Sequence, residues 1–128
     1  MTATATAESM YLVPPETVVE RPGEGAAFEL GALAAQSLLL ALRVEEILEQ
    51  ESLQVSVWGS GDGKDWGATP LFLYPERFYA GTTPAALDLS QRPEVKFLEA
   101  RWQVNRWGRG YPVPRFRFSL KIQYLAGH

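Results

Sequence analysis

Apolar and polar residues alternate with a period of two over much of this chain. In the segment 53–58 every second residue is apolar, and the positions between are Gln, Ser and Trp. The segments 96–104 and 115–124 repeat this pattern over longer stretches. Because the side chains of a strand point alternately to its two faces, the pattern predicts three strands that each bury one face.

The predicted inward positions of these three strands are apolar and mostly large. Strand by strand they are Leu53, Val55 and Val57; Leu98, Ala100, Trp102 and Val104; and Phe116, Phe118, Leu120, Ile122 and Tyr124. Trp102 and Phe118 are the bulkiest of these side chains that lie in the middle of a strand, so we expect both to be core residues on adjoining strands.

Residues 32–51 fit two structures. Their content of Ala, Leu, Glu and Gln favours a helix by intrinsic propensity. Four residues would form one stripe of that helix: Leu33, Leu40, Val44 and Leu48. The same stretch also alternates as a strand does, with these residues on one face: Leu38, Leu40, Leu42 and Val44. We favour the strand because the rest of the chain has β patterning, and we expect it to pair with 53–58 through the connection 45–52.

Short apolar runs separated by turns complete the pattern. Short strands are expected at 10–13, 17–19, 28–30, 70–74 and 87–89. Turns rich in Gly, Pro and Thr are expected at 21–25 and 81–84, and Pro14 and Pro15 are expected to end the first strand. Many short strands at close spacing indicate a sandwich or a jelly roll. The predicted fold is therefore all-β, an antiparallel β-sandwich of jelly-roll type.

The segment 59–63 is expected to end the strand that begins at Leu53. The dipeptide Asp62-Gly63 suits a tight turn that needs a positive φ, which we expect at Gly63. Trp66 follows as an apolar anchor that can fold back onto the sheet. Asp62 and Asp65 have an alternative role as calcium ligands, since hard cations bind clustered oxygens. The full spacing of a calcium loop is absent, so we predict no metal site.

The length of 128 residues suits one domain with its own hydrophobic core. We expect a disordered tail at residues 1–9 and a single β-sandwich domain at residues 10–128. Cysteine is absent, so neither disulfides nor thiolate metal sites hold the chain together. The one histidine is His128, the last residue, which argues against histidine-based catalysis.

The charge of this chain is unevenly distributed. The formal net charge is -3, but nine glutamates and two arginines precede Ser60, whereas ten Lys and Arg residues and six acids follow it. Two interpretations stay open. The opposite charges form complementary faces within one domain, or they form an acidic and a basic face that meet on neighbouring subunits.

Nothing in the chain matches a catalytic motif. Four glutamates near the connection 45–52 resemble a paired-carboxylate site: Glu45, Glu46, Glu49 and Glu51. They are better explained as a solvated connection between strands. We therefore predict neither enzymatic activity nor a cofactor. No run reaches the roughly 18 apolar residues of a membrane span, and the first residues lack the features of a signal peptide. A cytoplasmic or virion-associated protein is expected.

Three pieces of the second half follow one another as in a discoidin, or galactose-binding-like, jelly roll. They are the turn SGDGKDW at 60–66, the strand FLEARW at 97–102 and the closing strand FSLKIQYLAG at 118–127. The resemblance covers residues 53–127. It implies a jelly-roll fold and a carbohydrate ligand.

A second resemblance covers residues 28–124. The strand LLLALRV at 38–44, a short connection and the segments 53–66 and 97–104 together resemble small β-sandwich proteins encoded among phage and prophage virion genes. This resemblance implies a structural role in an assembled particle.

The segment 105–114 is the main candidate for a binding site. It connects two strong strands, so its tip is expected to be exposed. Trp107, Tyr111, Arg106 and Arg109 belong to the residue types that anchor interfaces and stack on sugars. Alternatively, the Trp107 side chain packs over the end of the hydrophobic core. Trp58 is the further candidate, because it faces away from the predicted core and suggests a partner.

We therefore predict a non-enzymatic structural or assembly protein that acts through protein–protein surfaces as a homo-oligomer, as in a virion. The alternative is a carbohydrate-binding module of galactose-binding-like type, with a glycan as its ligand. Basic and aromatic residues interleave between Arg101 and Arg117, which is typical of nucleic-acid contacts. The acidic total charge argues against that interpretation, so neither nucleic acid nor a membrane is expected as a partner.

Overall fold

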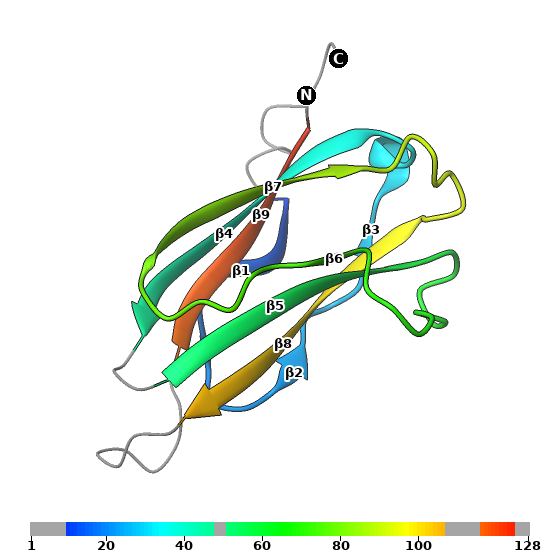
Figure 1. Cartoon of the computed structure of the whole chain (residues 1–128). Coiled ribbons are helices and arrows are strands. Elements are labelled where there is room, and N and C mark those ends of the chain that lie inside the picture. The colour runs from blue at the N-terminus through cyan, green and yellow to red at the C-terminus, as the bar shows by residue number, and fades with distance from the viewer. Residues whose placement is uncertain (1–9, 48–50, 107–115, 125–128) are drawn as a thin grey trace.

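Two antiparallel sheets face each other across one apolar core (Figure 1). The computed structural model describes residues 10–47, 51–106 and 116–124, and nine strands lie in these ranges. The elements are β1 (Tyr11–Val19), β2 (Gly23–Glu24), β3 (Phe28–Glu29), the 3-10 helix η1 (Gly31–Leu33), β4 (Ser37–Ile47), β5 (Glu51–Ser60), β6 (Phe72–Leu73), β7 (Gly81–Asp88), β8 (Phe97–Arg106) and β9 (Phe116–Tyr124). The predicted all-β sandwich is confirmed.

The strand pairs are nested inside one another along the chain. The first sheet has the order β1-β9-β4-β7, and the second has the order β2-β8-β5-β6, with β3 also paired to β8. β5 pairs with β6, β4 with β7, β2 and β3 with β8, and β1 with β9. This is the pairing of one long hairpin that is folded into two layers. Within the described part of the chain, no helix is long and apolar enough to cross a membrane.

The inward faces of the four central strands form the core, as their periodicity predicts. Their wholly buried residues are Leu38, Leu40 and Leu42 of β4; Leu53, Val55 and Val57 of β5; Leu98 and Ala100 of β8; and Phe116, Phe118, Leu120 and Ile122 of β9. Trp102 is 8% exposed, and its ring meets the Phe118 ring edge-on with 5.6 Å between centroids. Both are core residues as predicted, but their strands lie in opposite sheets, so the rings meet across the sandwich.

Residues 37–47 form a strand, which resolves the choice between helix and strand. Its predicted partner was wrong, because β4 pairs with β7 and β9 whereas β5 pairs with β6 and β8. The chain crosses from one sheet to the other between β4 and β5. The inward residues are apolar from Leu38 to Val44 of β4 and from Leu53 to Val57 of β5, and the crossing lets each face bury the other.

The prolines of the edge strands do not end them, contrary to the sequence-based expectation. The two short strands predicted at 10–13 and 17–19 form the single strand β1, whose pairing with β9 shifts register between Tyr11 and Val13 and again between Val13 and Thr17. The turn predicted at 81–84 is the start of β7, and the turn predicted at 21–25 contains the short strand β2. β1 and β7 are edge strands, where a residue without an N–H is tolerated.

Tyr74 ties the two sheets together. Its ring is wholly buried next to β5, and its hydroxyl donates a 2.8 Å hydrogen bond to the carbonyl oxygen of Leu40 on β4. The Phe72 ring packs edge-on against it at 4.9 Å between centroids. Burial raises the pKa of the Tyr74 hydroxyl well above its usual value, so the group stays protonated and keeps donating.

Replacing Tyr74 with Phe should remove this bond and leave the ring in place. We expect Tyr74→Phe to lower the free energy of unfolding by about 1 kcal/mol, since that is the net contribution of a buried hydrogen bond. Urea unfolding measures the change. Tyr79→Phe is the matched control, because Tyr79 is 78% exposed. Equal stability of Tyr74→Phe and wild type would contradict a structural role for the hydroxyl.

Phe118 tests the core between the sheets. Phe118→Ala should lower the free energy of unfolding by about 3–5 kcal/mol, because it removes a wholly buried ring and leaves a cavity. Phe118→Leu should cost clearly less, as it keeps most of the apolar volume. Thermal and urea melts of both variants give the comparison. A Phe118→Ala protein as stable as Phe118→Leu would show that the ring does not fill the core.

Candidate functional site

The five residues predicted to bind a partner have different outcomes. Trp107, Arg109 and Tyr111 lie outside the described residues. For Arg106 the structure describes the backbone, which ends β8. Trp58 is the one of the five whose side chain the structure places. The predicted binding segment between β8 and β9 therefore stays a prediction.

Trp58 lies on the outer face of the second sheet, away from Val55 and Val57 as predicted. Its indole N–H donates a 2.9 Å hydrogen bond to the Ser56 hydroxyl. The Arg101 guanidinium lies over the indole, with its carbon 4.2 Å from the ring centroid, in a cation–π contact. These two contacts hold the half-buried ring against its own sheet.

Arg101 links this ring to a buried acid. Its Nε donates a 2.8 Å hydrogen bond to Glu99, which is only 7% exposed although it lies on the outer face. The guanidinium therefore neutralises Glu99 and at the same time covers one face of the Trp58 indole. A sugar ring that stacked on that face would have to displace Arg101.

The turn after β5 is held by its own hydrogen bonds. Gly63 has φ 79°, which confirms the predicted positive φ. One carboxylate oxygen of Asp62 accepts hydrogen bonds from the backbone N–H groups of Lys64 (2.8 Å) and Asp65 (2.9 Å) and from the Ser60 hydroxyl (2.9 Å). These donors, the backbone groups first, lower the pKa of Asp62 to about 2. Hydrogen bonding within the turn thus accounts for Asp62 without a calcium ion.

The glutamates near the β4–β5 crossing are divided between the sheets. Glu45 and Glu46 belong to β4, Glu51 begins β5 and is 1% exposed, and Glu49 lies outside the described residues. In the described ranges there is no group of three or more His, Cys, Asp or Glu side chains that could hold a metal ion.

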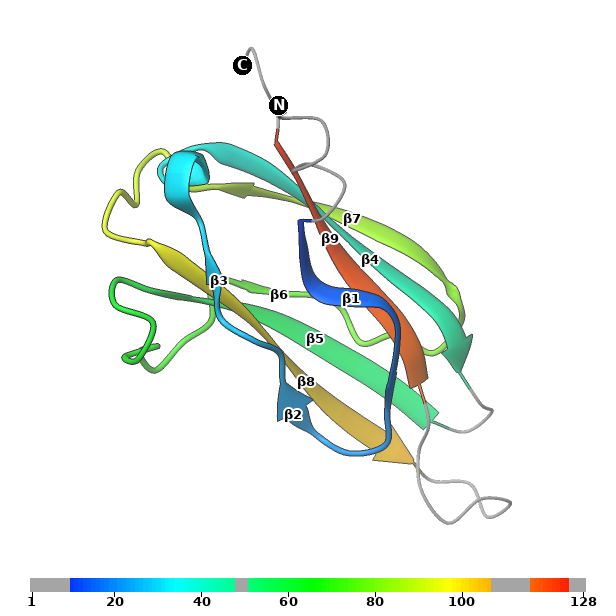
Figure 2. The same cartoon turned by 180° about the vertical axis from the view of Figure 1, so that it is seen from behind.

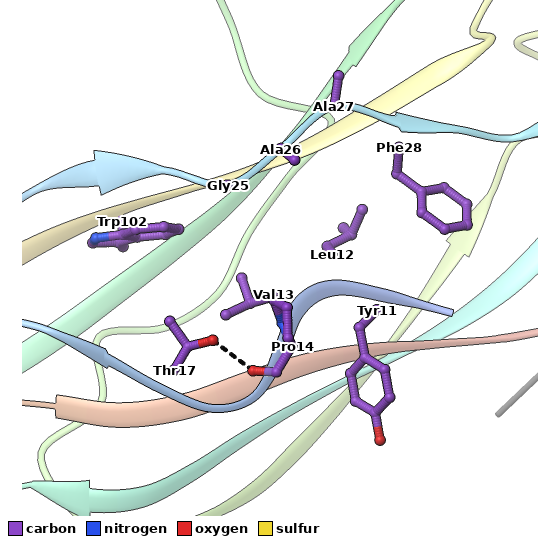
Figure 3. Close-up of a pocket in the computed structure, with 10 residues that line it drawn as sticks. All are labelled: Tyr11, Leu12, Val13, Pro14, Thr17, Gly25, Ala26, Ala27, Phe28 and Trp102. Atoms are coloured by element: carbon purple, nitrogen blue, oxygen red, sulfur yellow. Dashed lines mark hydrogen bonds between the residues drawn. The ribbon is translucent and has the colours of Figure 1, made fainter. Parts of the chain in front are cut away.

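A groove opens along the edge where β1 of the first sheet faces β2 and β3 of the second (Figure 3). Its inner part is an apolar cavity of about 260 Å³, lined among others by Leu12, Val13, Pro14, Ala26, Phe28 and Trp102. A second hollow of about 520 Å³ shares Trp102 with it and is otherwise lined by residues 18–24. We call the two hollows together the Trp102 groove.

Small residues beside Trp102 create this groove. Gly23 pairs with Trp102 across the strands, and a methyl group on Gly23 would lie 3.4 Å from the indole. A methyl group on Gly25 would meet the carbonyl oxygen of Leu12 at 2.8 Å, so β1 approaches closely only because this residue is glycine. The indole N–H donates to the carbonyl oxygen of Arg21 at 3.1 Å, which fixes the ring at the base of the groove.

The rim of the Trp102 groove is acidic. Residues 11–30 include four glutamates, all exposed, and one arginine, Arg21. Glu20 and Glu24 line the outer hollow, and Glu16 and Glu29 are the other two glutamates of this segment. Sequence reasoning placed Trp102 in the core and did not find the groove. Gly23 and the segment Gly25-Ala-Ala27 were the available signal, because such small residues leave space beside a buried aromatic ring.

The opposite edge of the sandwich carries exposed apolar side chains. The exposed fractions are 53% for Leu73, 44% for Phe78 and 78% for Tyr79. Two backbone hydrogen bonds of 2.9 and 2.7 Å join Arg77 to Leu53 of β5. The backbone directly before Phe78 and Tyr79 is therefore anchored to the sheet. We call Phe78 and Tyr79 the aromatic edge. Sequence periodicity did not find it, because residues between strands have no regular alternation.

The sheet edges are poorly suited to pairing with another strand. β1 contains Pro14 and Pro15, β7 contains Pro84, and β2 and β3 have only two residues each. β6 is equally short and lies between Pro70 and Pro75. Proline and short length are common means of blocking edge-to-edge association. Contacts with partners are therefore expected to use side chains.

Comparison of the chain with models of known protein families, with curated proteins and with solved structures finds no match.

The Asp62 turn predicts a specific pH dependence. The pKa of Asp62 falls from its ordinary value of 3.8 to about 2 on folding, so the ionised group stabilises the fold fully above about pH 4. This stabilisation is lost as the pH falls from about 4 to 2. Asp62→Asn should therefore be less stable than wild type at pH 7, and the difference should shrink at pH 2. Urea midpoints at pH 7, 4 and 2 test this, and a difference that persists unchanged at pH 2 would contradict it.

Proposed function

We propose that the protein is a non-enzymatic structural component that assembles through protein–protein contacts, as a subunit of a virion-like or other multi-subunit particle. The observation that supports this most is the position of its exposed apolar side chains. Three of the four large ones in the described residues, Leu73, Phe78 and Tyr79, lie within seven consecutive residues along one edge. Scattered exposed apolar residues are normal, but clustered ones are typical of interaction sites.

The residue types at this edge suit an interface. Tyr and Phe are enriched at protein–protein contacts, and Tyr supplies a large rigid surface at low entropic cost. Arg77 adds a cation beside them, and its backbone is anchored to β5. The blocked strand edges favour the same mode of contact, in which side chains of one surface pack on another.

We further propose that the sandwich is a jelly roll. The strand orders β1-β9-β4-β7 in the four-stranded sheet and β2-β8-β5-β6 in the five-stranded sheet, where β3 also pairs with β8, correspond to a long hairpin wrapped on itself, which is how a jelly roll is connected. Viral capsid proteins and lectins both use this architecture. The architecture thus supports the assembly proposal without separating it from sugar binding.

Carbohydrate binding is the second candidate, and Trp58 is the residue that favours it. Its ring lies half-buried on the outer face of a sheet, where sugar-binding proteins place aromatic platforms. Arg101 over the ring weighs against it, because the stacking face is already in use.

Light scattering after size exclusion tests the assembly proposal. The wild-type mass should exceed the 14.2 kDa of one chain and should rise with concentration. The double variant Leu73→Ser, Tyr79→Ser should lower the mass without lowering the melting temperature, since both side chains are largely exposed. Tyr79→Phe is the matched control and should keep the wild-type mass. Wild-type protein that stays monomeric at millimolar concentration would overturn the proposal.

The same assay separates the other candidate sites. Trp107→Ala, Tyr111→Ala should lower the mass if the segment between β8 and β9 also contacts a subunit. Trp58→Ala should leave the mass unchanged under the assembly proposal. A glycan-array signal from wild type that Trp58→Ala abolishes, with no change in mass, would instead establish carbohydrate binding.

A further inference from the structure

We propose that the aromatic edge of one copy of this chain inserts into the Trp102 groove of a second copy, with the Tyr79 ring in the apolar cavity. This inference rests on the proposed assembly function and names its contact. One surface carries a projecting aromatic side chain, and the other carries a cavity of matching chemistry.

The two surfaces lie on opposite edges of the sandwich. β1 and β7 are the two edges of the first sheet, and β2 and β6 are the two ends of the second sheet. Figure 1 shows β6 and β7 toward the viewer, and Figure 2, turned by 180°, brings β1, β2 and β3 to the front. Neither surface of one copy can therefore reach the other surface of the same copy. Contact between them requires a second copy.

The cavity fits an aromatic ring in size and lining. Its volume is about 260 Å³, whereas a cavity of about 150 Å³ holds a benzene molecule. Leu12, Val13, Phe28 and Trp102 supply an apolar and aromatic wall. Tyr79 is 78% exposed, so its ring would exchange water for this wall on association.

The charges around the two surfaces are complementary. The groove rim carries exposed glutamates, among which Glu20 and Glu24 line its outer hollow. Beside the aromatic edge lies Arg77. Arg43 pairs with Thr82 at the start of β7; its side chain is 67% exposed and lies 4.0 Å from Glu45. The nearby Glu76 accepts a hydrogen bond from the Ser52 hydroxyl. Opposite charges facing each other set the orientation of a contact and speed its formation.

A contact between two different surfaces does not close on itself in a pair. In such a dimer the first copy keeps an unoccupied groove and the second keeps an unoccupied aromatic edge, so growth continues to a ring or a filament. The inference therefore predicts masses above that of a dimer. A contact between two identical surfaces would stop at the dimer.

Two variants that each disable one surface provide the test. Tyr79→Ser removes the inserted ring and keeps the groove, and Ala26→Trp fills the groove and keeps the ring. Figure 3 shows the Ala26 methyl toward the cavity and the Ala27 methyl away from it, so Ala27→Trp is the matched control. Both alanines are exposed, which makes larger side chains tolerable. Loss of an aromatic anchor weakens association by about thirtyfold or more.

Each disabled variant alone should be monomeric at concentrations where wild type and Ala27→Trp associate. An equimolar mixture of Tyr79→Ser and Ala26→Trp should give a species of twice the monomer mass and nothing larger, because it contains one working groove and one working aromatic edge per pair. A mixture that stays monomeric would overturn the inference. If Tyr79→Ser lowers the mass and Ala26→Trp does not, the result supports assembly through the aromatic edge and contradicts its insertion into the Trp102 groove. A wild-type protein that is monomeric would contradict both the assembly function and the groove contact.

Charge reversal gives an independent measurement if Ala26→Trp does not fold. Glu20→Arg and Arg77→Glu should each weaken association, and the chain that carries both should recover it, since the pair is restored with opposite polarity. Equal masses for all three variants would contradict the proposed contact. Association of wild type should also weaken as salt rises from 50 to about 500 mM, because exposed charge pairs are screened.

Discussion

Mutual burial of the inward faces of β4, β5, β8 and β9 is the interaction on which the rest of this structure depends. Each face carries a row of apolar side chains, and most of them are wholly buried. Burial of one such Leu, Ile or Phe side chain contributes about 1.5–3 kcal/mol, so the four rows together supply most of the stabilisation. The outer strands are consequently free to be irregular. β1 contains a register shift and a glutamate, Glu16, at φ 64°.

The four central strands follow from the sequence because their period of two extends over nine to eleven residues. The partner of each strand does not follow, since periodicity states which side chains face inward and not which strand lies next. This is why β4 was expected beside β5 and lies instead in the opposite sheet. The expected strand ends at the prolines were also wrong because the position of each strand in its sheet was unknown. Proline breaks a strand only where a neighbouring strand needs a backbone N–H at its position, and β7 has a neighbour on one side only.

The candidate surfaces depend on what the core leaves uncovered. Trp102 was expected in the core and is 92% buried, yet it also forms the base of a groove because Gly23 and Gly25 stand beside it. Tyr79 belongs to no strand, so no periodic pattern marks it. Both positions become visible only when the strand order is known, because that order places them at opposite edges. Trp58 was found from sequence because alternation alone assigns it to the outer face. Its partner Arg101 was not, because it lies on another strand.

The nested strand order has a consequence for the time at which the protein can fold. Within the described residues β1 pairs only with β9, and β2 and β3 pair only with β8, so these three strands have no strand partner until nearly the whole chain exists. At about 5–20 residues per second, β1 waits roughly 5–20 s on the ribosome before β9 is made. During that time an unpaired apolar strand is exposed to other nascent chains. Pro14 and Pro15 interrupt its row of N–H groups and so lower its capacity to pair with them. The irregularity that the finished sandwich tolerates at its edge thus protects the unfinished chain.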